Sequence, residues 1–230
     1  MHNPLTMKQK NVVNCAECDF SELCSAYLFV KKDPIFTRNL ETKRKISRGV
    51  YLYRRGDKVD AIYALRSGIA KIFDPCGQLM GVVLPGQVMG VEELSEVSCR
   101  VDIQAATDIE VCVLSSNHFY EMSQLMPGFT DYLIRILSRS ARDKQQFISV
   151  LTKRETLHKV QYFLQLLSDI YKEHGFEYRK IKLPVSKKEL AELLGISLST
   201  LTRTLEGLAA KGIVVMPNKK EITLLNYEKE

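Results

Sequence analysis

Three cysteines near the start of the chain have a spacing that suits a soft metal. Cys15 and Cys18 are separated by two residues and Cys24 follows after five more, which gives C-x2-C-x5-C. Cysteine thiolates bind zinc and iron–sulfur centres. A zinc site usually adds a second cysteine pair or two histidines, whereas the four histidines of this chain are isolated from one another. The pattern indicates a metal centre, and a thiol–disulfide pair such as Cys15 and Cys18 is the alternative.

A fourth thiolate has to come from Cys76, Cys99 or Cys112. In residues 109–113 the apolar side chains occupy the odd positions, so Cys112 is expected to point away from the core of a strand. The same alternation in residues 101–105 puts Cys99 on the core side, and Cys76 lies in a turn. We therefore predict Cys112 as the fourth ligand, with Cys76 as the second choice.

Length and composition are those of an ordinary globular chain without a membrane anchor. The 230 residues, 45% of them hydrophobic, suffice for one large or two modest domains. No apolar run approaches the roughly 18 residues of a membrane span, and no signal peptide is visible. Six cysteines without a sign of secretion favour metal or redox chemistry over a disulfide scaffold. We expect a cytoplasmic protein with no membrane contact.

Residues 45–115 have the pattern of an all-β roll or barrel. Short alternating runs such as 50–53, 61–65 and 69–73 are separated by turns rich in glycine. Frequent turns between short strands are typical of antiparallel β architectures.

The pattern becomes helical after Pro127. Residues 128–152 contain two apolar stripes, one of which comprises Phe129, Leu133, Ile136 and Phe147. The second stripe has the heptad spacing that lets two helices pack along their length, so it predicts a dimer interface. Its members are Ile134, Leu137, Ala141, Lys144, Ile148 and Leu151. In a symmetric dimer Lys144 would face its own copy, which opposes association. A second helix is expected over about 157–173.

Residues 186–212 have the pattern of a helix-turn-helix. Ser186 and Glu189 form a capping box, and Gly195 permits the turn before a second helix over 197–211. A charged strand is expected over 178–183, and two strands, 213–216 and 222–225, are expected to form a two-stranded wing. The residues predicted to contact DNA are Ser197, Ser199, Thr200, Thr202 and Arg203 in the helix and Lys219 and Lys220 at the tip of the wing.

Basic charge gathers in the same part of the chain. Residues 141–230 hold sixteen Lys and Arg against eleven Asp and Glu, which is a surplus of five positive charges. The net charge of the whole chain is +6, so most of it lies in this part. Such a surplus suits a polyanionic partner. Arg203 suits a bidentate contact to guanine. An electron-transfer or redox enzyme is less favoured, because neither a nucleotide-binding glycine motif nor a catalytic triad or carboxylate pair is visible.

Taken together, these residues resemble the oxygen-sensing FNR branch of the CRP/FNR superfamily over essentially the whole chain. The match rests on the cysteine pattern with Cys112 in residues 110–113, on residues 63–68, on Met126-Pro127 and on Leu194-Gly195. The resemblance implies an α+β fold in four parts. They are a cysteine-bearing arm (1–30), an antiparallel β-roll sensor domain (31–125), a dimerisation helix (126–152) and a winged helix-turn-helix (153–230).

The resemblance also implies a mechanism. A [4Fe–4S] cluster would be held by Cys15, Cys18, Cys24 and Cys112, and the intact cluster would favour a homodimer that binds a palindromic promoter site and works with RNA polymerase. Oxygen would destroy or convert the cluster and dissociate the dimer.

The sequence departs from the family pattern at three positions. Ser199 replaces the glutamate of the family's E-x-x-S-R helix, so the family's usual operator is not expected. Lys144 stands where the family has an acid. Asp19 follows the second cysteine in place of a small hydroxyl residue, which changes the charge beside the cluster.

No cyclic nucleotide is expected as a ligand. The Arg-Ser pair that binds the nucleotide phosphate in the wider family aligns with Cys99-Arg100, and Gly86-Gln87 replaces the usual Gly-Glu. Arg100 is therefore interpreted as a surface charge.

Overall fold

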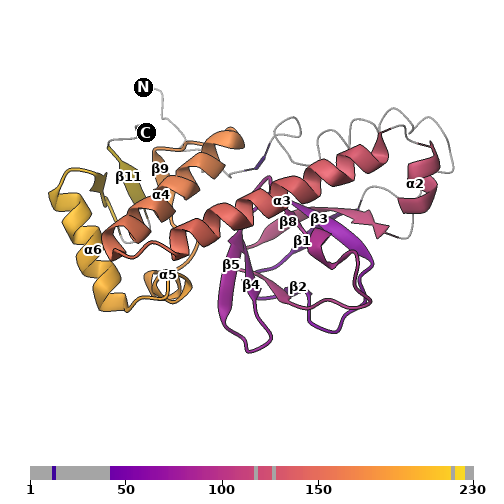
Figure 1. Ribbon diagram of the computed structural model, residues 1–230, viewed down its shortest axis with the longest axis horizontal. Helices are drawn as coiled ribbons and strands as arrows, with labels where there is room; N and C mark the ends of the chain where they lie inside the picture. Colours follow the sequence, from indigo (N-terminus) through magenta and orange to yellow (C-terminus); the bar gives the residue numbers. More distant parts are fainter. Residues whose placement is uncertain (1–11, 14–41, 117–118, 126–127, 219–220, 226–230) are drawn as a thin grey trace, which may run out of the picture.

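The computed structural model describes residues 12–13, 42–116, 119–125, 128–218 and 221–225. A β-roll lies on one side of the molecule and a small helical unit with its own sheet lies on the other, and the long helix α3 runs across both (Figure 1). This arrangement confirms the expected α+β class with an antiparallel roll followed by a helix-turn-helix unit.

The roll consists of two four-stranded antiparallel sheets. The first has the order β1 (Thr42–Ile46), β8 (Ile109–Ser115), β3 (Ala61–Ser67) and β6 (Val88–Met89). The second has the order β2 (Tyr51–Tyr53), β7 (Asp102–Ala105), β4 (Ala70–Phe73) and β5 (Leu79–Val83). Alternating apolar side chains fill the space between the sheets, among them Leu65, Ile103 and Val111. The period-2 pattern of the sequence is therefore the cause of this core.

One turn of the roll requires glycine. Gly68, between β3 and β4, has φ +84°, and a Cβ added there would lie 2.3 Å from the carbonyl oxygen of Asp108. A larger residue would have to displace that backbone, so the turn accepts glycine alone.

The long helix α3 (Phe129–Leu151) begins directly after the pattern change at Pro127, and α4 (Thr156–Glu173) follows it. Before the change, the described chain contains the 3-10 turn η2 (Val91–Glu93) and α2 (Phe119–Leu125). Helix α3 agrees with the helix expected over 128–152, while α2 was not expected from the sequence. Among the described helices, none is both long and apolar enough to cross a membrane.

The C-terminal unit contains β9 (Lys180–Lys182), α5 (Lys187–Leu193), α6 (Leu198–Ala210), β10 (Val214–Val215) and β11 (Glu221–Leu224). The strand order is β10-β11-β9: β10 and β11 pair as the expected wing, and β9, within the strand expected over 178–183, joins them as a third strand that was not expected there. Ile181 of β9 pairs with Ile222 of β11, and both are buried, so the third strand is held by the same core as the helices.

Three apolar cores hold these parts together. The first fills the roll, and the second lies between the first sheet, α2 and the N-terminal half of α3; we call the second the sensor-side core. The third joins α4, α5 and α6 to Leu79 and Leu84 of the roll, and we call it the DNA-side core. Helix α3 contributes Phe129 and Ile136 to the sensor-side core and Val150 to the DNA-side core.

Candidate functional site

The N-terminus of α6 is organised by Ser197. Its Oγ accepts a hydrogen bond from the backbone N–H of Thr200 at 3.0 Å, as an N-cap should, and lies 2.9 Å from the hydroxyl of Ser199. Ser199 is exposed, whereas Thr200 is partly buried. The first turn of α6 therefore presents hydroxyl groups in a fixed arrangement at the end of the helix.

The two faces of α6 differ in the way the sequence predicts. Leu201, Leu205 and Leu208 are fully buried in the DNA-side core. Arg203 is exposed on the other face. The hydroxyl of Thr202 donates to the carbonyl oxygen of Leu198 at 2.9 Å, so its proton is used within the helix. This hydroxyl can therefore only accept a further hydrogen bond, so a partner of the Thr202 hydroxyl would have to be a donor.

Helix α5 is fixed at its start by the predicted capping box. The backbone N–H of Ser186 donates to Glu189 Oε2 at 3.0 Å, and the Ser186 hydroxyl accepts from the Glu189 N–H. Lys71 of β4 also forms an ion pair with Glu189, which ties the roll to the helix-turn-helix. Burial raises the pKa of Glu189, but the hydrogen bonds from Lys71 and Ser186 outweigh it and hold that pKa below its ordinary value. Lys219 and Lys220 lie outside the described residues.

The two stripes of α3 have different environments. In the first, Phe129 and Ile136 are buried and Leu133 and Phe147 are partly buried. Most of the second stripe is exposed, with Ile134 at 54% and Ile148 at 57% of their surface in solvent. Its other members are Leu137, Ala141 and Lys144, which are exposed, and Leu151, which packs partly against the DNA-side core.

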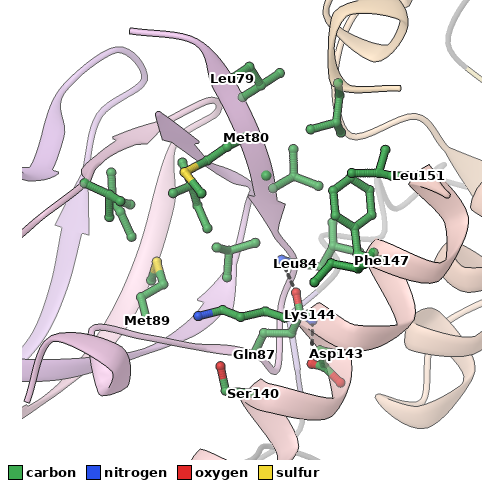
Figure 2. Close-up of a pocket in the computed structure, with 18 of the residues that line it drawn as sticks. Leu79, Met80, Leu84, Gln87, Met89, Ser140, Asp143, Lys144, Phe147 and Leu151 are labelled. Atoms are coloured by element: carbon green, nitrogen blue, oxygen red, sulfur yellow. Dashed lines mark hydrogen bonds between the residues drawn. The ribbon is translucent and has the colours of Figure 1, made fainter. Parts of the chain in front are cut away.

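Lys144, on the second stripe, has an oppositely charged partner within its own chain. Its Nζ lies 2.7 Å from Glu92 Oε1 of the roll, and the Ser140 hydroxyl donates to the same carboxylate. Figure 2 shows the Lys144 side chain extending from α3 towards the roll. In a dimer the two Lys144 side chains would therefore not be unpaired ammonium groups, because each chain carries a counter-charge for its own lysine.

A cavity of about 820 Å³ lies between β5, α3, α4 and the C-terminal end of α5. Apolar side chains such as Leu84, Phe147 and Leu151 line much of it (Figure 2). On the roll side it contains the carboxylates of Glu92 and Glu93. The lining carries charges of both signs, because Lys144 and Lys159 also belong to it.

The three described cysteines lie in different environments. Cys99 is buried within the roll, and burial, with Glu93 and Asp57 nearby, raises the pKa of its thiol to about 11. Cys76 is exposed in the turn between β4 and β5, where its N–H donates to Asp74 Oδ1 at 2.8 Å. A buried thiol with a raised pKa is a poor metal ligand at neutral pH.

Cys112 lies on the outer face of the first sheet. It is partly buried and packs against the sensor-side core, whereas its neighbours Val111 and Val113 pack against the core inside the roll. The outward orientation expected from the sequence is therefore present. Cys15, Cys18 and Cys24 lie outside the described residues. Within the described part of the chain, no three His, Cys, Asp or Glu side chains are grouped as a metal site.

A short segment of the N-terminal arm is docked close to this face. The backbone N–H of Val13 donates to the carbonyl oxygen of Arg66 at 2.9 Å, and the Val13 side chain is 2% exposed in the sensor-side core. Val13 was not predicted from the sequence. The apolar pair Val12-Val13, just before the first cysteine of a polar arm, is a signal that could have revealed it. Glu92 and Lys71 were not predicted either, and no local signal exists for them.

Two family models match the chain in succession. The model "Cyclic nucleotide-binding domain" matches residues 43–125, and "Crp-like helix-turn-helix domain" matches residues 159–229. The first covers the roll and α2, and the second covers the unit that contains α5, α6 and the small sheet.

Curated relatives and solved structures agree with these models. The transcriptional activator protein Anr of Pseudomonas protegens is 28% identical over 208 residues, which are 88% of this chain and 85% of that protein. The fumarate and nitrate reduction regulatory protein of Yersinia pestis is 26% identical over 94% of this chain and 88% of its own length. FixK2 from Bradyrhizobium japonicum shares the fold, with a TM-score of 0.66 and 20% identity over 81% of this chain and 93% of that one.

The two matched models account for both halves of the fold, and the relatives match along nearly their whole length. The outward face of α6 has a capped N-terminus and an exposed Arg203, and the second helix of a helix-turn-helix is the one that enters the major groove. The chain belongs to the CRP/FNR family and is a DNA-binding transcription regulator of the FNR type.

Proposed function

We propose that this regulator senses oxygen or nitric oxide through a [4Fe–4S] cluster bound by Cys15, Cys18, Cys24 and Cys112, and that the cluster controls dimerisation and promoter binding. The observation that carries the proposal is the docking of Val13, two residues before Cys15, on the core that Cys112 also contacts. FNR-type relatives that match 88% and 94% of the chain support it.

The environment of Cys112 fits a cluster ligand better than that of the other described cysteines. Its side chain is partly accessible, so a thiolate there could bind iron without entering the closed interior of the roll. Cys99 is enclosed, and Cys76 is in a turn of the second sheet, whereas Val13 docks on β3 of the first sheet. The reach of the arm from Val13 therefore favours Cys112.

A bound cluster would supply a centre whose charge and stability respond to oxidants. The residues of this chain supply its surroundings. Arg66 of β3 forms an ion pair with Glu110 of the neighbouring strand β8 at 2.5 Å. Glu110 lies two residues before Cys112 on β8. The ion pair gives the Glu110 carboxylate a counter-charge, and the sensor-side core keeps water from one side of Cys112.

Helix α3 supports a homodimer. Ile134, Leu137 and Ile148 expose large apolar surfaces at heptad spacing on one face of the helix. Contact with the same face of a second copy would remove these side chains from water. Because Glu92 pairs with Lys144 within each chain, the lysine reduces the stability of such a dimer less than an unpaired charge would.

A dimer would present two copies of α6 to a palindromic promoter site, with Ser197, Ser199, Thr200, Thr202 and Arg203 at its surface and Lys219 and Lys220 near the phosphates. RNA polymerase would be the partner at the promoter. We expect a cytoplasmic location because that is where the DNA of a bacterial cell lies, and we expect neither enzymatic activity nor a cyclic nucleotide ligand.

The organisation that we propose follows the sequence prediction. It consists of an arm (1–30), a sensor roll (31–125), a dimerisation helix (126–152) and a winged helix-turn-helix (153–230). The end of the first family model at residue 125 and the position of α3 before the second model support the limits of the dimerisation helix.

The experiment is to purify the whole chain without oxygen and to compare it with the same sample after exposure to air. We expect a brown protein with about four iron atoms per chain that sediments as a dimer, and we expect air to remove both the colour and the dimer. A colourless sample that dimerises when its thiols are reduced or oxidised would support the thiol–disulfide alternative instead.

A further inference from the structure

Val12 and Val13 form a strand-like contact with the end of β3 in the first sheet. Ser67 pairs with Glu110 of β8 on one side and with Val12 on the other, so the arm lies beside the last residues of β3, beyond the part of that strand which pairs with β6. The register of β3 against β8 shifts between Leu65 and Ser67, which is the position of a β-bulge. A bulge changes the direction of the backbone groups. Here the carbonyl oxygen of the intervening Arg66 accepts a hydrogen bond from the N–H of Val13 at 2.9 Å.

The two valines have opposite environments. Val12 is 41% exposed, whereas Val13 is 2% exposed and packs in the sensor-side core. Ala64 belongs to the same core and is paired across the sheet with Cys112. Val13 is therefore held on the side of the sheet that bears the Cys112 thiol.

The position of Val13 limits where the first cysteine can go. Cys15 follows two residues later, and two residues span at most about 7 Å. An arm held at Val13 thus keeps its cysteines at a high effective concentration near the face of Cys112, whereas a free arm would have to close a much longer loop.

The same core contains α3. Phe129 and Ile136 pack in it with Val13, and the opposite side of α3 carries Ile134 and Leu137 of the exposed stripe. Val13 is therefore the one described residue of the arm that belongs to the apolar core beneath the proposed dimerisation helix.

We infer that Val13 is a positioning residue: it docks the arm beside Cys112 and joins the cysteine segment to the core beneath α3. The inference rests on the proposed function for its role towards the cluster, but the docking itself does not depend on a cluster. Loss of the anchor should loosen the arm, slow cluster assembly and weaken the coupling between the cluster and α3.

Val13→Ala tests the inference, with Val12→Ala as the matched control and Val13→Ile as the conservative variant. In the cluster-free protein, backbone amide exchange at residues 12–13 should rise at least tenfold in Val13→Ala and stay within about twofold of the wild type in the other two. In the anaerobically reconstituted protein, Val13→Ala should lose iron to a chelator several times faster, and Val13→Ile should restore the wild-type rate.

The two readouts separate the docking from the proposed function. Equal amide exchange in Val13→Ala and in the wild type would overturn the docking. Raised exchange with an unchanged rate of iron loss would overturn the positioning role. If the wild type takes up no cluster, the proposed function fails and the positioning role with it, while the exchange measurement still decides the docking.

Discussion

The two ends of α3 are held in different ways. At the N-terminal end, Phe129 and Ile136 lie in the sensor-side core, which has eight buried residues within the described chain. At the C-terminal end, Val150 lies in the DNA-side core, which has twenty-one and includes the centre of the helix-turn-helix. Among the described residues, the sensor end is thus the smaller core and includes one residue of the arm, while the DNA end belongs to a larger folded unit.

Polar contacts between the roll and the rest of the molecule sharpen this difference. Near the DNA end, Lys71 pairs with Glu189, and Gln87 donates to Asp143 of α3 at 2.9 Å. At the sensor end the described contacts between the arm and its core are a single backbone hydrogen bond and apolar packing. A small change at the sensor end is therefore expected to alter the packing of α3 without unfolding the unit that binds DNA.

The largest effect is expected from Phe129→Ala. Phe129 is 2% exposed and lies edge-on to Phe119, with ring centroids 5.5 Å apart, so its removal should cost about 3–5 kcal/mol of the free energy of unfolding of the sensor-side core. Urea unfolding and amide exchange would measure this. Leu137→Ala, on the exposed side of the same helix, is the control, and equal losses in the two variants would contradict the division of α3 into a buried and an exposed stripe.

Gly86→Ala should damage the junction between the roll and α4. Gly86 has φ +101°, and a Cβ there would lie 1.9 Å from Cδ2 of the buried His174 at the end of α4. Gly77→Ala shares the strain of a positive φ, at +80°, but has nothing within 4 Å. We expect Gly86→Ala to be less stable than Gly77→Ala by about 1–3 kcal/mol in thermal or urea unfolding. Similar stabilities would mean that the roll and α4 do not meet at His174.

Arg203→Ala should affect the DNA end alone. Loss of a bidentate base contact costs about 1–3 kcal/mol of binding free energy and relaxes the preference at one base pair. Selection from a randomised DNA site would measure both. Lys211→Ala, at the other end of α6, should leave the base preference unchanged. An equal loss of affinity for specific and random DNA in Arg203→Ala would assign Arg203 to a phosphate.

The smallest effect is expected from the pair between Lys71 and Glu189. Its side chains are 16% and 32% exposed, so a double-mutant cycle of Lys71→Met and Glu189→Gln should give a coupling of about 1 kcal/mol in unfolding free energy. Glutamine preserves the capping box, which separates the pair from the cap. Because the pKa of Glu189 is lowered in the folded state, its contribution is present at neutral pH and is lost as the pH falls. A coupling near zero would mean that the roll does not hold α5 electrostatically.

The sequence predicted best what depends on neighbours along the chain. The period-2 runs identified the roll, and helical periodicity with caps located α3 and α6 to within a residue or two. The outward orientation of Cys112 followed from alternation in β8 alone. Local patterns therefore sufficed for the fold and for the outward face of each strand and helix.

Contacts between distant residues could not be predicted in this way. Lys71 and Glu189 are 118 residues apart, and no periodicity connects them. The pairing of β9 with β11 and the ion pair of Lys144 with Glu92 likewise arise only when the chain is folded. The docking of Val13 depends on a bulge in β3, which the sequence did not reveal.

The most direct test of the account compares Cys112→Ser with Cys76→Ser after anaerobic reconstitution with iron and sulfide. Both replacements remove one thiol, but of these two cysteines only Cys112 packs against the sensor-side core, to which Val13 also belongs. We predict that Cys76→Ser retains the iron and sulfide content of the wild type and dimerises, and that Cys112→Ser retains neither cluster nor dimer. A full cluster in Cys112→Ser, or its loss in Cys76→Ser, would contradict the account.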